Sequence, residues 1–143
     1  MNDVDKKVAY IGGTFEVPHL GHANLIRRVQ ALGFEVVVAV NGDRFVFENR
    51  GYVPLYDEFE RMGLVNQLGV ETVVVPTMFS QGRIISRYSP DVIVLGMDWF
   101  GKDLHKQFAV EEGFFEANKI GFLFLPRTPG VSSSELKRRL KDE

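Results

Sequence analysis

The sequence contains no cysteine. This absence excludes a disulfide framework, a cysteine nucleophile and a zinc site ligated by cysteine. It is compatible with a reducing compartment but does not require one. The 143 residues fit a single domain, 1–143, and are enough to bury a substantial core.

The sequence also lacks an excess of positive charge, a visible signal peptide and a long apolar run. The formal net charge is −2, so no global basic field attracts nucleic acid, whereas a small anionic substrate needs only a local positive cluster. Residues Met1–Lys7 are polar and carry both signs, and runs such as Val36–Val40 are too short to span a bilayer. We therefore expect a cytoplasmic protein with no nucleic-acid or membrane partner.

Two widespread phosphate-binding patterns are missing as well. The sequence contains neither the GxGxxG dinucleotide fingerprint nor the P-loop pattern GxxxxGK[ST]. A phosphate site in this chain must therefore use another arrangement.

Short apolar runs rich in β-branched residues alternate with longer amphipathic runs. Such strands are typical of a parallel sheet covered on both faces, and the alternation predicts a doubly wound α/β domain with right-handed crossovers. The predicted strands are Val8–Gly12, Glu35–Asn41, Glu71–Pro76, Asp91–Leu95 and Gly121–Leu125. The predicted helices are His19–Leu32, Leu55–Leu68, Gln81–Tyr88, Lys102–Lys119 and Ser133–Lys141.

The stretch from Gly12 to His22 joins the first predicted strand to the first predicted helix. His19 and His22 are three apart, so they share one face of that helix. Backbone N–H groups at a helix start are unpaired, and the helix dipole there favours an anion. Gly12 and Gly13 let a ligand approach the backbone, and Gly21 keeps the first turn narrow. The stretch predicts a site for polyphosphate.

Two other roles for the histidine pair remain open. The pair could hold a metal ion, but a stable site needs a third protein ligand, for which only His105 and Glu16 are candidates. The histidines could also form a purely structural pair. The surrounding glycines favour phosphate stabilisation over both alternatives.

A second polar segment, Gly96–Lys102, follows the fourth predicted strand. Loops after the carboxyl ends of strands line the ligand crevice in open α/β sheets. Asp98 could accept hydrogen bonds from a ribose or base, and Trp99 could stack on the ligand or wall its pocket. Alternatively, Asp98 caps a helix and Trp99 anchors the core. The sequence supports the two roles of Trp99 equally.

A third segment, Pro126–Glu135, follows the last predicted strand. Ser132 and Glu135 match a capping box at the start of a helix. Arg127 can fork onto phosphate oxygens, and serine hydroxyls can face the same anion. Capping and phosphate binding are compatible, so we predict both.

Two segments between these motifs have weaker signals. Phe45–Gly51 shows no clear period, and we interpret it as a loop. It either closes over a site as a lid or tucks its phenylalanines into the core or a dimer contact. Asp57, Glu58 and Glu60 are interpreted as a solvated helix face that complements the helix dipole, and Arg61 alone carries little signal.

Three segments together resemble a known superfamily. Gly13–His22 resembles the nucleotidyltransferase signature G-x-F-D-x-x-H-x-G-H. Gly96–Lys102 is similar to G-D-D-W-x-G-K, and Arg127–Ser133 is similar to R-T-x-G-I-S-T, both from the glycerol-3-phosphate cytidylyltransferase-like family. The segments occur in the family's order, and the resemblance covers nearly the whole chain.

The resemblance implies nucleotidyl transfer. A phosphate oxygen of a small phosphorylated alcohol, such as glycerol 3-phosphate, would attack the α-phosphorus of CTP, and pyrophosphate would leave to give a CDP-alcohol. His19 and His22 would be catalytic by stabilising charge on the phosphoryl oxygens. Mg²⁺ would bind through triphosphate oxygens and water rather than a protein metal site. The residues implied to bind the nucleotide and its phosphates are Gly12, Gly13, Thr14, Phe15, Glu16, Gly21, Arg61, Gly96, Asp98, Trp99, Arg127, Thr128, Gly130, Val131, Ser132 and Ser133.

The resemblance further implies a homodimer and a Rossmann-like, five-stranded parallel sheet in the order 3-2-1-4-5. The first and fourth strands are then neighbours at the point where the strand order reverses. The loops that follow them would therefore face one crevice.

The chain departs from the family pattern at three places. Glu16 replaces an aspartate and adds a methylene, and Met97 removes the first acid of G-D-D-W. Related enzymes often place a lysine from this part of the chain on the phosphates, but Asn41–Tyr52 contains no lysine. Arg44 or Arg50 could take its place, but arginine and lysine are not interchangeable at such sites. Two alternatives follow: an adenylyltransferase that uses ATP on a phosphorylated cofactor precursor or sugar phosphate, and a non-catalytic nucleotide-binding protein.

Overall fold

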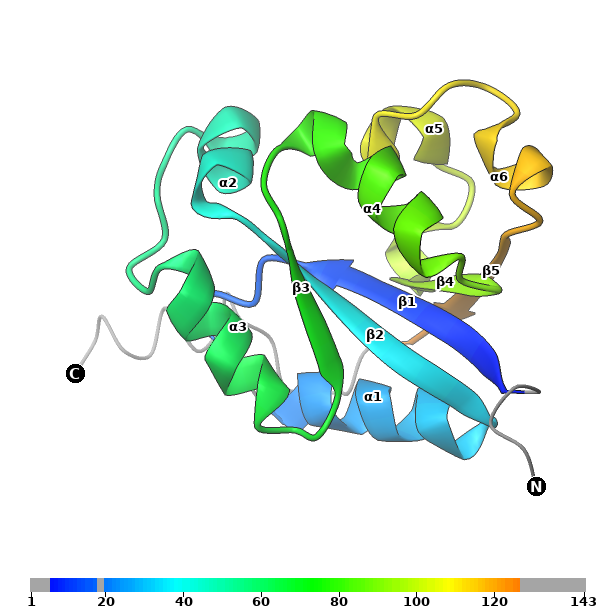
Figure 1. Cartoon of the computed structure of the whole chain (residues 1–143), viewed down its shortest axis with the longest axis horizontal. Helices are drawn as coiled ribbons and strands as arrows, with labels where there is room; N and C mark the ends of the chain where they lie inside the picture. The colour runs from blue at the N-terminus through cyan, green and yellow to red at the C-terminus, as the bar shows by residue number, and fades with distance from the viewer. Residues whose placement is uncertain (1–5, 18–19, 127–143) are drawn as a thin grey trace.

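Five parallel strands form one sheet in the order β3-β2-β1-β4-β5, which confirms the expected topology (Figure 1). The computed structural model describes residues 6–17 and 20–126. The strands are β1 (Lys7–Gly13), β2 (Phe34–Asn41), β3 (Glu71–Val75), β4 (Val92–Gly96) and β5 (Gly121–Leu125). The continuous apolar run Val36–Val40 is buried along its whole length in β2, as a strand covered on both faces requires.

Helices cover both faces of the sheet. They are α1 (Leu20–Ala31), α2 (Asp43–Arg50), α3 (Glu58–Asn66), α4 (Gln81–Tyr88), α5 (Leu104–Phe108) and α6 (Phe114–Ala117), with short 3₁₀ turns η2 (Met78–Ser80) and η3 (Met97–Trp99). Figure 1 shows α1 and α3 below the sheet and α2, α4, α5 and α6 above it. The arrangement is the predicted doubly wound α/β architecture.

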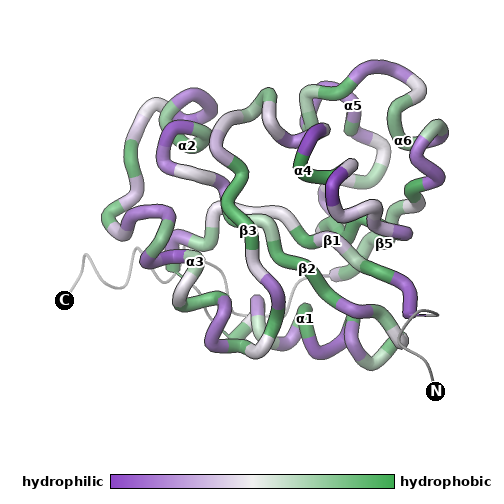
Figure 2. The backbone as a smooth tube through the Cα atoms, viewed as in Figure 1, coloured by the Kyte–Doolittle hydropathy of each residue, from purple (hydrophilic) through white to green (hydrophobic). Residues whose placement is uncertain are grey.

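Alternation along the strands separates two hydrophobic clusters. In β1, Ala9 and Ile11 face a cluster that includes Ile26 of α1 and Val65 of α3. Tyr10, between them, faces a cluster built with α2, α4, α5 and α6. Successive side chains of a strand point to opposite faces, so these clusters are the two layers of the core. Figure 2 shows largely hydrophobic strands in the centre and helices that alternate between hydrophilic and hydrophobic residues.

The predicted loop at Phe45–Gly51 is wrong, because this segment belongs to helix α2. Phe45 is buried in the core, whereas Phe47 is exposed. Arg44 and Glu48 form an ion pair one turn apart, and Gly51 ends the helix in the left-handed conformation with φ of 82°. These are ordinary helix signals, but they are spread over too few residues to produce a clear period.

Two predicted helices also need correction. The segment Lys102–Lys119 contains two short helices instead of one, because Ala109 and Gly113 adopt left-handed conformations with φ of 53° and 88°. The helix predicted over Leu55–Leu68 begins only at Glu58. The helix predicted over Ser133–Lys141 lies outside the described residues.

Acidic residues at the start of α3 have a more specific role than a solvated face. Asp57 accepts a hydrogen bond from the Glu60 N–H at 2.8 Å, and Glu60 accepts one from the Asp57 N–H at 3.2 Å. This reciprocal pair is a capping box. Its signal in the sequence is an acidic residue followed three positions later by a glutamate. Glu58 accepts a hydrogen bond from the Asp43 N–H at 3.0 Å and so joins α3 to the start of α2.

Within residues 6–17 and 20–126, no helix combines the length and the apolar character needed to cross a membrane.

Candidate active site

The loops that follow β1 and β4 leave the same edge of the sheet. The two strands are hydrogen-bonded neighbours, with Ile11 paired to Val94. Because both run parallel, the loop that begins at Thr14 and the turn η3 start side by side. The strand order reverses at this point, which is where open α/β sheets bind ligands.

The loop after β1 is shaped by an unusual backbone at Phe15. This residue has a φ of 55°, a left-handed conformation that L-residues with large side chains rarely adopt. Its buried ring covers Gly13 so closely that a Cβ there would lie 2.9 Å from the ring. The same ring lies 4.8 Å from the His22 ring, centroid to centroid, in the first turn of α1. The loop and the helix start are thereby packed together.

Thr14 is fixed through both its side chain and its backbone. Asn41, the last residue of β2, donates an amide hydrogen bond to Thr14 Oγ1 at 3.2 Å. Arg61 donates from Nη1 to the Thr14 carbonyl at 2.7 Å. The amide and the guanidinium therefore hold the loop against the end of β2.

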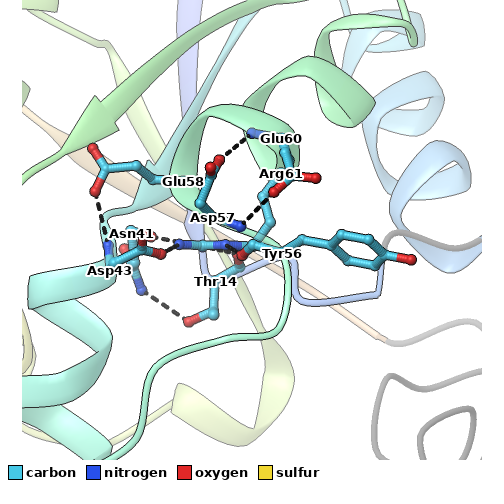
Figure 3. Close-up of polar contacts among 8 residues, drawn as sticks. All are labelled: Thr14, Asn41, Asp43, Tyr56, Asp57, Glu58, Glu60 and Arg61. Carbon is cyan, nitrogen blue, oxygen red and sulfur yellow. Dashed lines mark hydrogen bonds and ion pairs between the residues drawn. The ribbon is translucent and has the colours of Figure 1, made fainter.

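Arg61 is buried and bonded to protein groups rather than directed at solvent. Its side chain is 0% exposed and forms an ion pair with Asp43 at 2.7 Å. Figure 3 shows its guanidinium between Thr14, Asn41, Asp43 and the Tyr56 carbonyl. The resemblance implied a phosphate contact for Arg61, and the structure instead gives it a position beneath the loop.

Glu16 reaches a residue that the sequence did not single out. Tyr52, in the connection between α2 and α3, donates a hydrogen bond from its hydroxyl to Glu16 Oε2 at 2.9 Å. The extra methylene of Glu16 relative to aspartate therefore contributes to a contact with that connection. A lone tyrosine in a polar segment gave no sequence signal for this role.

The turn η3 carries Asp98 and Trp99 at the carboxyl end of β4. A Cβ on Gly96 would lie 2.6 Å from Asp98 Oδ1, so glycine leaves room for that carboxylate. Trp99 is only partly buried and lies under Lys102, whose Nζ is 5.1 Å from the indole centroid. Trp99 belongs to neither hydrophobic cluster, so a core-anchor role for it is wrong. The helix that follows, α5, is capped by Asp103, whose side chain accepts a hydrogen bond from the Lys106 N–H, and not by Asp98.

The third predicted wall of the crevice, which begins at Arg127, lies outside the described residues. The predicted site residues that lie outside the described ranges are His19, Arg127, Thr128, Gly130, Val131, Ser132 and Ser133. Gly12, Gly13, Thr14, Phe15, Glu16, Gly21, His22, Gly96, Asp98 and Trp99 all lie at or just beyond the carboxyl ends of β1 and β4.

The alternative metal site loses one of its candidate ligands. His105 is in α5 and its ring packs 5.0 Å from Phe115, in the cluster on the opposite face from α1. It cannot join His22 around one ion. Among residues 6–17 and 20–126, no group of three or more histidine, aspartate or glutamate side chains is placed to hold a metal.

Comparison with known proteins identifies the family. The sequence pattern of the family described as cytidylyltransferase-like matches residues 10–139, which is most of the chain. This protein belongs to the cytidylyltransferase-like family. The match agrees with the resemblance of its three motif segments to the nucleotidyltransferase superfamily.

Three curated relatives of this cytidylyltransferase-like protein have different names. It is 27% identical to glycerol-3-phosphate cytidylyltransferase of Staphylococcus aureus over 132 residues, which cover 90% of each chain. It is 30% identical to the bifunctional protein HldE of Campylobacter concisus over 139 residues, 96% of this chain but only 28% of HldE. It is 35% identical to FAD synthase of Thermococcus sibiricus over 97 residues, 65% of each chain.

The fold of the cytidylyltransferase-like chain also matches a solved structure. The lipopolysaccharide core biosynthesis protein from Thermoplasma volcanium superposes with a TM-score of 0.68, over 85% of this chain and 98% of that one. The sequence identity is 24%, so this match supports the fold alone.

Proposed function

We propose that this nucleotidyltransferase transfers a cytidylyl group from CTP to a small phosphorylated alcohol such as glycerol 3-phosphate. The observation that carries the proposal is the end-to-end match with the staphylococcal glycerol-3-phosphate cytidylyltransferase, over 90% of both chains. HldE is matched over only 28% of its length and FAD synthase over 65%.

The proposed reaction needs positioning more than proton transfer. The acceptor's phosphate oxygen forms a bond to the α-phosphorus of CTP, while the bond from that phosphorus to the bridging oxygen of pyrophosphate breaks. Pyrophosphate takes the electron pair. A phosphate ester has a second pKa of about 6, so it is already a dianion at neutral pH and requires no general base.

The residues at the crevice have distinct proposed roles. His19 and His22 stabilise charge on the phosphoryl oxygens as the transition state forms. Gly12 and Gly13 admit the triphosphate to the backbone, and Asp98 and Trp99 hold the nucleoside. The segment with Arg127, Thr128, Gly130, Val131, Ser132 and Ser133 also binds the triphosphate.

Mg²⁺ is proposed as the cofactor, bound through triphosphate oxygens and water. The described residues form no group of three or more possible metal ligands, which suits an ion that keeps most of its own water. The ion, when bound, would offset charge on the triphosphate. A homodimer is likewise proposed, and light scattering after gel filtration tests it.

Pyrophosphate release tests the substrate assignment. The protein is incubated with Mg²⁺, each nucleoside triphosphate and a panel of phosphate esters, and we expect turnover with CTP and glycerol 3-phosphate or a similar ester. Activity only with ATP would support the adenylyltransferase alternative, which the similarity to FAD synthase favours.

Two further measurements separate catalysis from binding. A His19→Ala variant should lose most activity, because it removes a transition-state contact. Tight CTP binding by calorimetry, with no pyrophosphate from any ester, would instead support a non-catalytic binding protein, an alternative motivated by Met97 and the lysine-free segment 41–52.

A further inference from the structure

We propose that Arg61 is a positioning residue that holds the loop after β1 in shape, and that it makes no contact with the nucleotide. The kinetic part of this inference rests on the proposed function. Its structural part concerns the protein without substrate and can be tested separately.

The guanidinium of Arg61 joins four parts of the chain. Its Nη1 donates to the Thr14 carbonyl at 2.7 Å and to the Asn41 carbonyl at 2.7 Å. Its Nε donates to the Tyr56 carbonyl at 3.0 Å, and its Nη2 donates to Asp43 at 2.7 Å. These acceptors belong to the loop after β1, the end of β2, the segment before α3 and the start of α2, as Figure 3 shows.

The burial of this charge is matched by a fixed partner. A buried guanidinium is strongly destabilising without an opposite charge. Asp43 supplies that charge, with its own side chain 28% exposed, and its backbone N–H is held by Glu58 at 3.0 Å. Helices α2 and α3 thus fix Asp43, and Asp43 orients Arg61 toward Thr14.

The same contacts exclude Arg61 as a ligand for phosphate in this arrangement. Its side chain is 0% exposed, and its hydrogen bonds to Thr14, Asn41, Tyr56 and Asp43 occupy nearly all of its donors. Reaching a phosphate would break the contacts that hold the loop. Arg61 therefore acts through Thr14 and the backbone beside it.

Lysine cannot replace arginine in this role. An ammonium group is a compact point charge, whereas the planar guanidinium spreads its donors over carbonyls from separate segments. Arg61→Lys keeps the charge but loses part of this bridge. Arg87→Lys is the matched control, because Arg87 is exposed on α4, where its guanidinium lies 5.7 Å from the centroid of the Tyr88 ring.

Hydrogen exchange of the ligand-free protein is the first test. Arg61→Lys should accelerate amide exchange in residues 12–17 and 41–43, because both segments lose a fixed carbonyl. Exchange in β5 and α4 should change much less, and Arg87→Lys should match the wild type throughout. Unchanged exchange in residues 12–17 of Arg61→Lys, with intact circular dichroism, would overturn the inference. Uniformly faster exchange would also overturn it, since Arg61 would then stabilise the whole fold.

Kinetics provide the second test. A loop displaced by about 1 Å can cost about 10²-fold in rate, so kcat of Arg61→Lys should fall on that order with a smaller change in the KM for CTP. Asp43→Asn should lower kcat in the same direction, because it weakens the contact that orients Arg61. If Arg61 bound phosphate directly, Arg61→Lys would mainly raise KM and Asp43→Asn would lower it, which would refute the proposal. If the wild type turns over no nucleotide, the proposed function fails, while the exchange experiment still decides the role of Arg61.

Discussion

Phe15 adopts a left-handed backbone conformation at the centre of the loop after β1. Such a conformation costs a bulky residue on the order of 1–3 kcal/mol and persists only when its surroundings enforce it. Here the buried ring packs over Gly13 and beside His22, and the preceding carbonyl is held by Arg61. The backbone strain at Phe15 therefore lies next to the residues proposed to bind the phosphates.

Gly96 provides a residue-scale test of the nucleoside side of the crevice. In Gly96→Ala the new Cβ would lie 2.6 Å from Asp98 Oδ1, so the carboxylate must turn away. Losing a charged hydrogen bond of about 1.5 kcal/mol should raise the KM for CTP about tenfold. Steady-state kinetics measure this.

Gly63→Ala is the matched control for that substitution. Gly63 lies inside α3, and a Cβ there meets no atom within 4 Å. This variant should keep the KM for CTP and gain about 0.5–1 kcal/mol of stability. An unchanged KM in a folded Gly96→Ala variant would remove Asp98 from the nucleotide site.

Glu16 and Tyr52 form a pair that can be dissected by a double-mutant cycle. Glu16→Asp withdraws the carboxylate by about 1.5 Å, one bond length, and Tyr52→Phe removes the donor of the 2.9 Å bond. Glu16 is among the residues expected to bind the nucleotide, so each substitution should raise the KM for CTP about two- to tenfold, because both break the same hydrogen bond. The double variant should be no worse than either single one; additive losses would show that the two side chains act independently.

The start of α3 shows how an element can support a site that it does not enter. The capping box of Asp57 and Glu60 fixes the first turn of α3. Tyr56, just before it, offers its carbonyl to Arg61, which is in the same helix. The helix thus presents Arg61 to the loop after β1 from a fixed first turn.

Removing the cap should weaken this element. Asp57→Ala should lower the free energy of unfolding by about 1 kcal/mol, because the Glu60 N–H loses its acceptor. Urea denaturation measures the loss. Asp57→Asn keeps a side-chain acceptor and should stay close to the wild type, and equal losses in both variants would mean that the carboxylate charge matters more than the cap.

At the scale of the whole molecule, the sheet separates two layers with different tasks. The layer with α1 and α3 carries His22 and Arg61, whereas the layer with α2, α4, α5 and α6 encloses Tyr10. Burial, and to a smaller extent Tyr88, raises the pKa of Tyr10 above its ordinary value of 10.0. The neutral phenol is thus strongly favoured in the folded protein.

Stability should therefore fall at alkaline pH. Above about pH 10 the unfolded chain releases the Tyr10 proton while the native state retains it, so the free energy of unfolding decreases by up to about 1.4 kcal/mol per pH unit. Tyr10→Phe should show a shallower loss between pH 10 and 11.5 and the same pH dependence as the wild type below pH 9. Urea denaturation across this range checks it, with Tyr56→Phe, at an exposed tyrosine, as the control. If the free energy of unfolding fell equally with pH in the wild type and in Tyr10→Phe, Tyr10 would not be the cause of the alkaline loss of stability.

The sequence by itself determined the fold class and, through its resemblance, the strand order, and it predicted which edge of the sheet binds the ligand. Continuous β-branched runs such as Val36–Val40 are readable because a buried strand must be apolar on both faces. The segments from Gly12 to His22 and from Gly96 to Lys102 were singled out because glycines, histidines and polar residues after a strand are typical of phosphate and nucleotide sites.

Only the tertiary structure decided which groups fix the loop after β1. Arg61, Asn41 and Tyr52 meet residues 47, 27 and 36 positions away in the chain, and such contacts leave no periodic trace in the sequence. The eight-residue helix α2 and the break at Ala109 were likewise hidden, because tertiary packing overrides weak local preference in short segments. The physical reason is that hydrophobic pattern sets which face is buried, whereas hydrogen-bond partners are set by which segments the folded sheet brings together.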